Sequence, residues 1–506
     1  MTPRESKTRT ITIEPLTRVE GHGKVSIHMN QQHEVEYARL HIVEFRGFER
    51  FIVGRPYWEI PVIVQRLCGI CPVSHHLAAA KAMDRIVGGE MLTPTAEKMR
   101  RLMHYGQIFQ SHALHFFHLS SPDLLFGTDG TAASGFEAPV EKRHVLAVAA
   151  EHPELATQAV MMRRFGQEVI FATAGKKIHG TGAIPGGVNK NLSIAERDRL
   201  LAEIDQMLVW TRGALGIAQS YTMDHLVELI PFGSFDSNHL SIVRADDGAL
   251  DLYDGVLRAI DKDGHRIVDG IDYQRYLEVV NEEVRPWSYM KFPFLKSLGP
   301  EHGWYRVGPL ARVNNCTFIP TDEAEAARKE FMALTKGRPN NITMCYHWAR
   351  MIELLHAIEV IRDLLHDPDL QGTDLVVQGP RREEAVGVIE APRGTLIHDY
   401  DVGDDDLVTR CNLIVSTTHN NQAMNEAVRA VARDYLDGHE LTEGLLNHIE
   451  VAIRAYDPCL SCATHALGQM PLDIALVGPD GALIDRVFRS QGEFVHDVSG
   501  AGGSGA

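Results

Sequence analysis

Two cysteine pairs at opposite ends of the chain constrain its fold more than any other feature. Cys68 and Cys71 form one CxxC pair and Cys459 and Cys462 form the other, with 387 residues between the pairs. Thiolates are soft ligands that suit zinc, copper, iron–sulfur clusters or a thiolate-bound iron or nickel. A zinc ribbon closes across about 15–20 residues. Pairs this far apart instead predict a site at the centre of the fold, where both ends of the chain meet.

The side chains beside these pairs favour a catalytic centre over a structural one. Arg66 and His75 flank the first pair, and Asp457 and His465 flank the second. Charged and protic groups of this kind orient metal ligands, hydrogen-bond thiolates and relay protons. From spacing alone, structural zinc and an iron–sulfur cluster stay open as alternatives. The other three cysteines are expected to be small core residues: Cys316, Cys345 and Cys411.

Composition and termini exclude several other functions. The 506 residues include 50 basic and 67 acidic side chains, a net charge of −17, so nucleic acid is not an expected partner. The chain contains no apolar stretch of about 18 residues, so a membrane span is not expected. The polar start MTPRESKTRT is no export signal, which predicts a cytoplasmic chain unless a partner carries it. The GxGxxG match at Gly500 to Gly505 follows no strand, so no nucleotide site is expected in this chain.

Hydrophobic spacing predicts an α+β fold that is mainly helical, with a large central helix bundle and peripheral β-strands. Strands are expected over 11–29, 34–45, 247–275 (around a turn at 261–264) and 373–415. Helices are expected over 95–119, 153–173, 194–222, 322–335, 345–366, 421–436 and 441–454. Thr95 is expected to start the first helix, with Lys98, Arg100 and Arg101 facing solvent. Only the tail SGAGGSGA is expected to be flexible.

The cysteine motifs and several shorter segments resemble one protein family. RxCGICxxxH around Cys68 and DPCxxCxxH around Cys459 together resemble the signature pair of nickel–iron hydrogenase large subunits. TRVEGHGK (17–24), FRGFE (45–49), EAPRG (390–394) and LIVSTTHN (413–420) look like family blocks in the family's order. PTAEKMRRL, SIAERDR, WSYMKFP and DPCLSCATHALGQMPL are most similar to the soluble, NAD-reducing group. The resemblance runs from Ile11 to the tail.

This resemblance implies a nickel–iron centre held by the four paired cysteines. All four would bind nickel, and Cys71 and Cys462 would bridge to an iron that carries carbon monoxide and two cyanide ligands. Glu20 would be the proton gate beside Cys459.

The resemblance also implies four supporting side chains around that centre. Arg393 would project over the vacant metal position, with Asp457 as its partner. His75 would hydrogen-bond the bridging sulfur of Cys71, and Thr417 would donate to a cyanide.

A magnesium site and a processing step are implied as well. Glu49, the backbone carbonyl of Leu413 and His465 would supply the protein ligands of Mg²⁺, a hard cation that prefers oxygen and retains waters. In the family a maturation protease cleaves just after that histidine once nickel is inserted. Residues 1–465 would then be a single mature domain, and residues 466–506 a C-terminal extension that is removed.

The function implied is reversible heterolytic cleavage of H2 to protons and electrons. This reaction needs a Lewis acid for the hydride and a nearby base for the proton. The three remaining cysteines are too few for a four-cysteine cluster. Electrons would therefore pass to an iron–sulfur small subunit and then to NAD through flavin and iron–sulfur diaphorase subunits. Nickel and iron insertion proteins would be further partners.

Three other functions are compatible with parts of this pattern. The chain could belong to another hydrogenase group, coupled to NADP, a deazaflavin or a heterodisulfide system. It could be a quinone-site subunit of respiratory complex I, although those subunits lack the cysteine ligands. It could also be a non-catalytic scaffold that one bound zinc ion stabilises.

Overall fold

The computed structural model describes residues 9–30, 32, 34–127, 130–436, 442–463, 473–477, 483–490 and 493–496. It confirms the α+β class and every predicted long helix. These helices are α4 (Pro94–Leu114), α8 (Pro153–Ala174), α9 (Ile194–Asp224), α14 (Asp322–Leu334), α15 (Cys345–Leu365), α17 (Asn421–Leu436) and α18 (Glu443–Ala455). A π-helical turn, His115–Ser120, continues α4. No helix of the described part is long and apolar enough to cross a bilayer.

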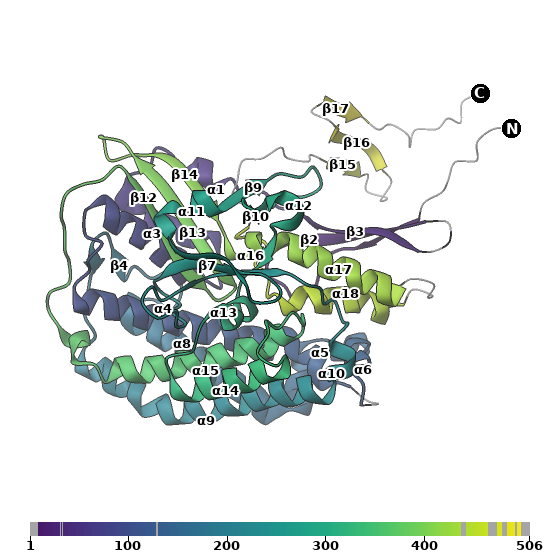
Figure 1. The fold of residues 1–506 in the computed structure, drawn as a ribbon, viewed down its shortest axis with the longest axis horizontal. Helices are drawn as coiled ribbons and strands as arrows, with labels where there is room; N and C mark the ends of the chain where they lie inside the picture. Colours follow the sequence, from purple (N-terminus) through teal and green to yellow (C-terminus); the bar gives the residue numbers. More distant parts are fainter. Residues whose placement is uncertain are drawn as a thin grey trace.

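Helices α4, α8, α9 and α15 build the bundle in the lower half of Figure 1. Helix α15 is buried along nearly its whole length, because α4, α9 and α14 all pack on it. Trp348 of α15 is 2% exposed and meets Phe331 of α14 edge to face, with ring centroids 5.3 Å apart. A helix that is buried on all sides needs such a surrounding, so α15 forms the axis of the core.

The start of α4 differs from the prediction by two residues. Thr93, not Thr95, is the N-cap, and its hydroxyl accepts the Ala96 N–H at 3.2 Å. Pro94 occupies the first helical position, where its missing N–H costs nothing. The cap therefore precedes the proline, and Thr95 is buried inside the first turn.

The prediction that Arg100 faces solvent is wrong, because this side chain is fully buried. Its guanidinium donates to both carboxylate oxygens of Asp84 at 2.5 and 2.8 Å, and to the Gly187 carbonyl at 2.8 Å. A buried charge is tolerated when a partner charge and hydrogen bonds satisfy it. Arg100 thereby ties α4 to α3 (Pro72–Ile86), which carries Asp84.

The predicted strand regions form antiparallel sheets. Their strands are β1 (Arg9–Ile13), β2 (Gly23–Met29) and β3 (Val35–Ile42); β6 (Asn238–Val243), β7 (Val256–Ile260) and β8 (Arg266–Asp272); and β12 (Glu384–Ala391), β13 (Gly394–Val402) and β14 (Val408–Ile414). The turn between β7 and β8 falls where the sequence predicts it, since Asp261 N–H bonds the His265 carbonyl and Gly264 takes φ 92°. A short parallel strand, β11 (Tyr305–Arg306), extends the second sheet beside β6.

The third sheet lies deeper than the rim of the molecule. Almost every residue of β12 and β13 is buried, and α3 packs on both strands. Their tight connection is the segment 391–394, so the buried hairpin carries this segment into the middle of the fold. The sheet is therefore part of the core that positions the site.

The C-terminal region contains a further sheet that the sequence analysis does not predict. Strands β15 (Asp473–Val477), β16 (Leu483–Ser490) and β17 (Glu493–His496) pair in this order (Figure 1). The tail expected to be flexible, 499–506, lies outside the described residues. The boundary after residue 465 stays a prediction.

The interior of the fold holds several histidines in the neutral form. Burial lowers the pKa of His104 and His239 to about 3, and that of His76 and His356 to about 4. Each is fully buried and hydrogen-bonded; His104 Nε2, for example, lies 2.9 Å from the Leu252 carbonyl oxygen. These imidazoles are therefore structural groups that stay uncharged at neutral pH.

Stability is accordingly expected to fall steeply as the pH drops below about 6.5, the pKa of these histidines in the unfolded chain. The folded chain takes up the same protons only near pH 3 to 4, so the unfolded state binds more protons in this window. Each such histidine removes about 1.4 kcal/mol of unfolding free energy per pH unit there. Urea midpoints measured at about pH 7, 6 and 5 should fall in growing steps. Equal midpoints at the two ends of this range contradict the neutral assignment.

Candidate metal centre

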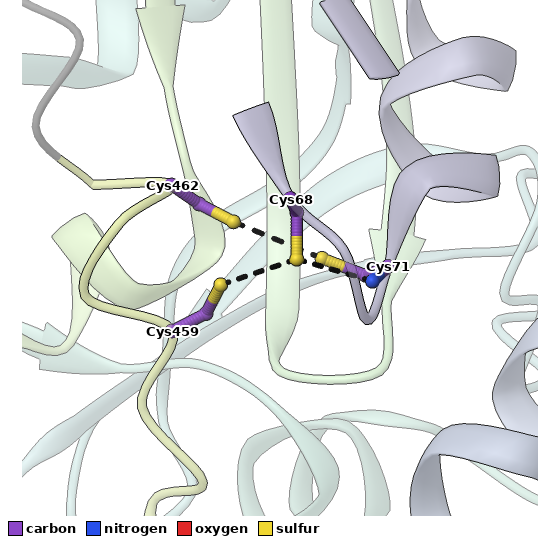
Figure 2. A group of neighbouring side chains, drawn as sticks. All are labelled: Cys68, Cys71, Cys459 and Cys462. Carbon is purple, nitrogen blue, oxygen red and sulfur yellow. Dashed lines mark hydrogen bonds between the residues drawn. The ribbon is translucent and has the colours of Figure 1, made fainter. Parts of the chain in front are cut away.

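The four cysteines of the two CxxC pairs meet at one buried point, as the sequence predicts. Cys68 lies in the turn before α3, and Cys71 is the N-cap of that helix. Cys459 and Cys462 lie in the turn after α18 and approach from the opposite side (Figure 2). The Sγ atoms of Cys68 and Cys459 are 3.4 Å apart, those of Cys71 and Cys462 are 3.9 Å apart, and all four lie within 4.8 Å of one another. This four-cysteine cluster is a ready ligand set for a soft metal.

Helix α3 presents the first pair but is not predicted from the sequence. Thirteen of its fifteen residues are buried, so its apolar positions show no one-sided period. A period of 3.6 residues is visible only where one face of a helix is wet. The available signal was Pro72 directly after Cys71, because proline favours the first position of a helix.

Hydrogen bonds from the backbone and from α4 hold the loop of the first pair. The N–H groups of Ile70 and Cys71 donate to Cys68 Sγ at 3.2 and 3.1 Å. Gln107 and Gln110 both donate their side-chain amides to the Ile70 carbonyl, at 2.8 and 2.9 Å. The bundle thus fixes the loop that carries two of the ligands, which is the support a precise metal site requires.

Burial and hydrogen bonding shift the pKa values of the cluster's thiols in different directions. Burial raises the pKa of Cys459 and Cys462 well above the usual value. At Cys68 burial acts in the same direction, but hydrogen bonds from the other three thiols outweigh it and hold the pKa well below its usual range. The nearby Arg393 guanidinium lowers this pKa further. The cluster therefore favours a thiolate at Cys68, and the thiolate is the form that binds metal.

Asp457 holds Arg393 beside the cluster. Arg393 Nε donates to the Asp457 carbonyl at 2.7 Å, and Nη2 donates to its carboxylate at 3.0 Å. Burial disfavours the charge on Arg393, but Asp457 and the cysteines outweigh it and raise its pKa well above the usual value. Among the described residues, Arg393 Nη1 and Asp457 Oδ2 find no hydrogen-bond partner. Buried donors normally have an acceptor, so the Arg393 Nη1 group in the wall of the site is suited to bind an acceptor group placed in the cavity.

Glu20 connects the cluster with the protein surface. Its Oε2 atom accepts a hydrogen bond from Cys459 Sγ at 3.0 Å and one from the Ser461 N–H at 3.1 Å. The Ser461 hydroxyl donates to Glu44 at 3.3 Å, and Glu44 contacts the exposed side chain of His22. Glu20 is only partly buried, so the carboxylate that contacts the Cys459 thiol also lies within reach of solvent.

A small cavity lies against the cluster, with His75, Cys71 and Thr417 in its wall. Its open volume of about 10 Å³ is the space that one water-sized molecule needs. The Thr417 hydroxyl oxygen accepts the Cys459 N–H at 2.9 Å, so its own proton is left to donate elsewhere. Val415 contributes an apolar part of the wall. The cavity combines a few polar donors with a dry surrounding.

Two of the three predicted magnesium ligands lie side by side. Glu49, in the short helix α1 (Phe48–Ile52), is 8% exposed, and its Oε1 atom accepts the Leu413 N–H at 2.8 Å. The carbonyl predicted to bind the ion belongs to the same buried Leu413. The third predicted ligand, His465, lies outside the described residues. The magnesium site stays a prediction.

Two polar residues behind the cavity wall are not predicted from the sequence: His398 and Tyr400. His75 Nδ1 lies 3.1 Å from His398 Nε2, and His398 Nδ1 lies 2.7 Å from the Tyr400 hydroxyl. Positions 398 and 400 share one face of β13, because side chains in a strand alternate with a period of two. The available signal was two polar residues on a strand face whose other members are Gly394, Leu396 and Val402.

Family models match most of this chain. A model described as nickel-dependent hydrogenase matches residues 46–155 and 251–465, and one described as HoxL-like matches residues 10–45. The chain belongs to the nickel-dependent hydrogenase family, and the protein is a hydrogenase.

Individual relatives place it more closely within that family. The NAD-reducing hydrogenase HoxS subunit beta of Cupriavidus necator is 51% identical over 496 residues, which cover 95% of this chain and 100% of that protein. The crystal structure of an NAD⁺-reducing NiFe hydrogenase in the H2-reduced state matches with 58% identity and a TM-score of 0.87, over 90% of this chain and 100% of that one. The Ni-Fe-Se hydrogenase from D. vulgaris Hildenborough shares the fold, with a TM-score of 0.72 at 23% identity, over 90% of this chain and 100% of that one.

Proposed function

We propose that this chain is the catalytic subunit of an NAD-coupled nickel–iron hydrogenase that cleaves H2 reversibly into protons and electrons. The observation that carries the proposal is the buried four-cysteine cluster with Glu20 at one sulfur and Arg393 beside it. The 51% identity to a relative named as NAD-reducing supports the coupling to NAD.

The donor set of the site fits a nickel–iron centre. The four-cysteine cluster would hold both metals, with iron carrying carbon monoxide and two cyanides. The unpaired Arg393 Nη1 and the free proton of Thr417 are donors of the kind that small acceptor ligands on iron require. When bound, the centre supplies the Lewis-acid and redox chemistry of heterolytic H2 cleavage.

The residues around the cluster would handle the proton and exclude water. Glu20 accepts the proton at Cys459 Sγ and, because it is only partly buried, releases it toward solvent on the side where Ser461 binds Glu44. Arg393 places a fixed positive charge beside the thiolates, which stabilises negative charge that develops there. Since all four cysteines are buried, bulk solvent does not compete with these groups.

We further propose the magnesium site and the processing of the chain end. Glu49, the Leu413 carbonyl and His465 would bind Mg²⁺, and the contact between Glu49 and Leu413 supports this set. A maturation protease would cleave after His465, following the action of nickel and iron insertion proteins. The position of Cys462 three residues earlier links that cut to closure of the metal site.

Electrons would leave through partner subunits. Cys316 and Cys345 are buried thiols whose pKa burial raises to about 12, which suits core packing better than ligation. With Cys411 they number three, too few for a four-cysteine cluster. An iron–sulfur small subunit and flavin and iron–sulfur diaphorase subunits would therefore carry the electrons to NAD. We place this complex in the cytoplasm, where the NAD pool is available.

An infrared spectrum of the complex purified from its native host tests the proposed function. Protein groups are nearly silent in the region where metal-bound carbon monoxide and cyanide absorb. We expect one carbonyl band and two cyanide bands, and one nickel per chain by metal analysis. The intact mass of the same sample should equal that of residues 1–465.

The outcomes separate the main alternatives. A chain of the processed mass that lacks all three bands and binds one zinc contradicts the hydrogenase centre and supports a zinc scaffold. Normal bands in a complex that reduces artificial dyes but not NAD contradict only the NAD coupling.

A further inference from the structure

Three buried side chains form a hydrogen-bonded chain from the cavity into the third sheet. His75 lines the cavity, its Nδ1 atom meets His398 Nε2 at 3.1 Å, and His398 Nδ1 meets the Tyr400 hydroxyl at 2.7 Å. None of the three is more than 1% exposed. Helix α3, which bears His75, packs on β13, which bears the other two. The wall of the metal site thus continues through hydrogen bonds to Tyr400.

The Tyr400 hydroxyl sets the direction of the protons in this chain. Burial raises the pKa of Tyr400 well above its usual value, so the hydroxyl stays protonated. A buried O–H needs an acceptor, and in the described part of the chain His398 Nδ1 lies within hydrogen-bond distance of it. His398 then carries its own proton on Nε2 and donates to His75 Nδ1. By the same logic His75 carries its proton on Nε2.

We propose that Tyr400 and His398 are positioning residues that fix the Nε2–H tautomer of His75 and thereby keep one N–H donor in the cavity wall that the cluster's sulfurs line. The inference rests on the proposed function, since it treats these sulfurs as metal ligands. With the opposite tautomer, His75 Nε2 would carry a lone pair in a wall of electron-rich sulfurs, which disfavours that tautomer. Outer partners that fix the ring and tautomer of an imidazole are a general means of tuning a metal site.

The Tyr400→Phe variant of the purified holoenzyme complex tests this inference. Phenylalanine keeps the ring and its packing but removes the proton that orients His398. We expect kcat for H2 oxidation to fall about tenfold, the effect of losing an outer partner of a metal ligand, with KM unchanged. The carbon monoxide and cyanide bands should shift or split, because the loss of this donor from the cavity wall changes the electron density on the sulfurs there. Unchanged bands together with unchanged kcat overturn the inference.

Tyr276→Phe is the matched control. Its hydroxyl is also buried and donates to Asp399 of the same sheet at 2.8 Å, in a contact directed away from the histidine chain. This variant also removes a buried tyrosine hydroxyl, with its bonds to Asp399 and Asn412, yet its bands and kcat should stay at the wild-type values. Equal band shifts in both variants would assign the effect to the sheet and overturn the inference.

Two substitutions of His398 separate control of the tautomer from packing. In His398→Gln the side-chain amide can still donate to His75 Nδ1, whereas in His398→Met no donor remains. We expect the glutamine variant to stay near the wild-type band positions and the methionine variant to match Tyr400→Phe. Identical behaviour of these two variants overturns the inference. Absence of the bands from the unmodified, processed complex would instead overturn the proposed function itself.

Discussion

Replacing Glu20 by glutamine is expected to lower hydrogen turnover about 10³-fold while the metal centre stays intact. The Glu20 Oε2 atom lies 3.0 Å from the Cys459 sulfur and also accepts the Ser461 N–H. Glutamine keeps an acceptor for that N–H, but its amide cannot take up a proton. A positioned acid–base group contributes about 10²–10⁴-fold to a rate. Hydrogen-dependent dye reduction measures the loss, and the infrared bands report the centre.

Glu44→Gln is the control for this prediction. Glu44 binds the Ser461 hydroxyl rather than the Cys459 sulfur, and its side chain is 30% exposed, so water can replace it. We expect a much smaller loss of turnover than with Glu20→Gln, and normal bands in both variants. Wild-type turnover in a Glu20→Gln complex with normal bands contradicts the assignment of proton transfer to Glu20.

Much of the helical bundle could be predicted because its outer helices have one wet face. Helix α9 is typical, since Ser193 and Glu196 form a capping box at its start and polar residues line its exposed side. The same reasoning identifies α15 at the centre of the fold but fails for other buried parts. Helix α3 is buried on all sides, and Arg100 is charged yet fully buried, because Asp84 offers it a partner sixteen residues away. Hydrophobic periodicity shows which apolar residues are buried, but it cannot show that a charged residue is buried beside a partner of opposite charge.

The same distinction applies to the residues of the site. The cysteines and Glu20 sit in short local motifs, so sequence alone marks them. Their support comes from residues that are distant in the chain: His398 lies 323 residues from His75. No local spacing encodes such a contact, because it depends on which helix packs on which strand. The supporting residues therefore become visible only once the tertiary structure is known.

The segment that carries Arg393 depends on one buried arginine. Arg312, in α13 (Pro309–Asn315), donates to the carbonyls of Ala391 and Pro392 at 2.8 and 3.2 Å. Its guanidinium also donates to Glu390 at 2.9 Å, at the start of the same segment. All these contacts are buried, so Arg312 fixes the backbone directly before Arg393.

Arg312 also neutralises a second buried carboxylate. Its Nε and Nη2 atoms donate to both oxygens of Glu353 at 2.6 Å. Burial alone would raise the pKa of Glu353, but the Arg312 guanidinium and its hydrogen bonds hold this pKa at about 2. Removing the arginine would therefore leave Glu353 and Glu390 as two buried carboxylates without their shared cation.

Arg312→Met is accordingly expected to lower the free energy of unfolding by about 3–5 kcal/mol, the cost of an uncompensated buried charge. Arg212→Met is the matched control, because Arg212 makes the same bidentate contact with Glu323 on the surface and should cost less than about 1 kcal/mol. Adding Glu353→Gln to Arg312→Met should recover part of the loss, since it removes one of the stranded charges. Urea unfolding of the three variants measures these differences. If Arg312→Met and Arg212→Met unfold at the same midpoint, the buried contacts of Arg312 do not stabilise the fold.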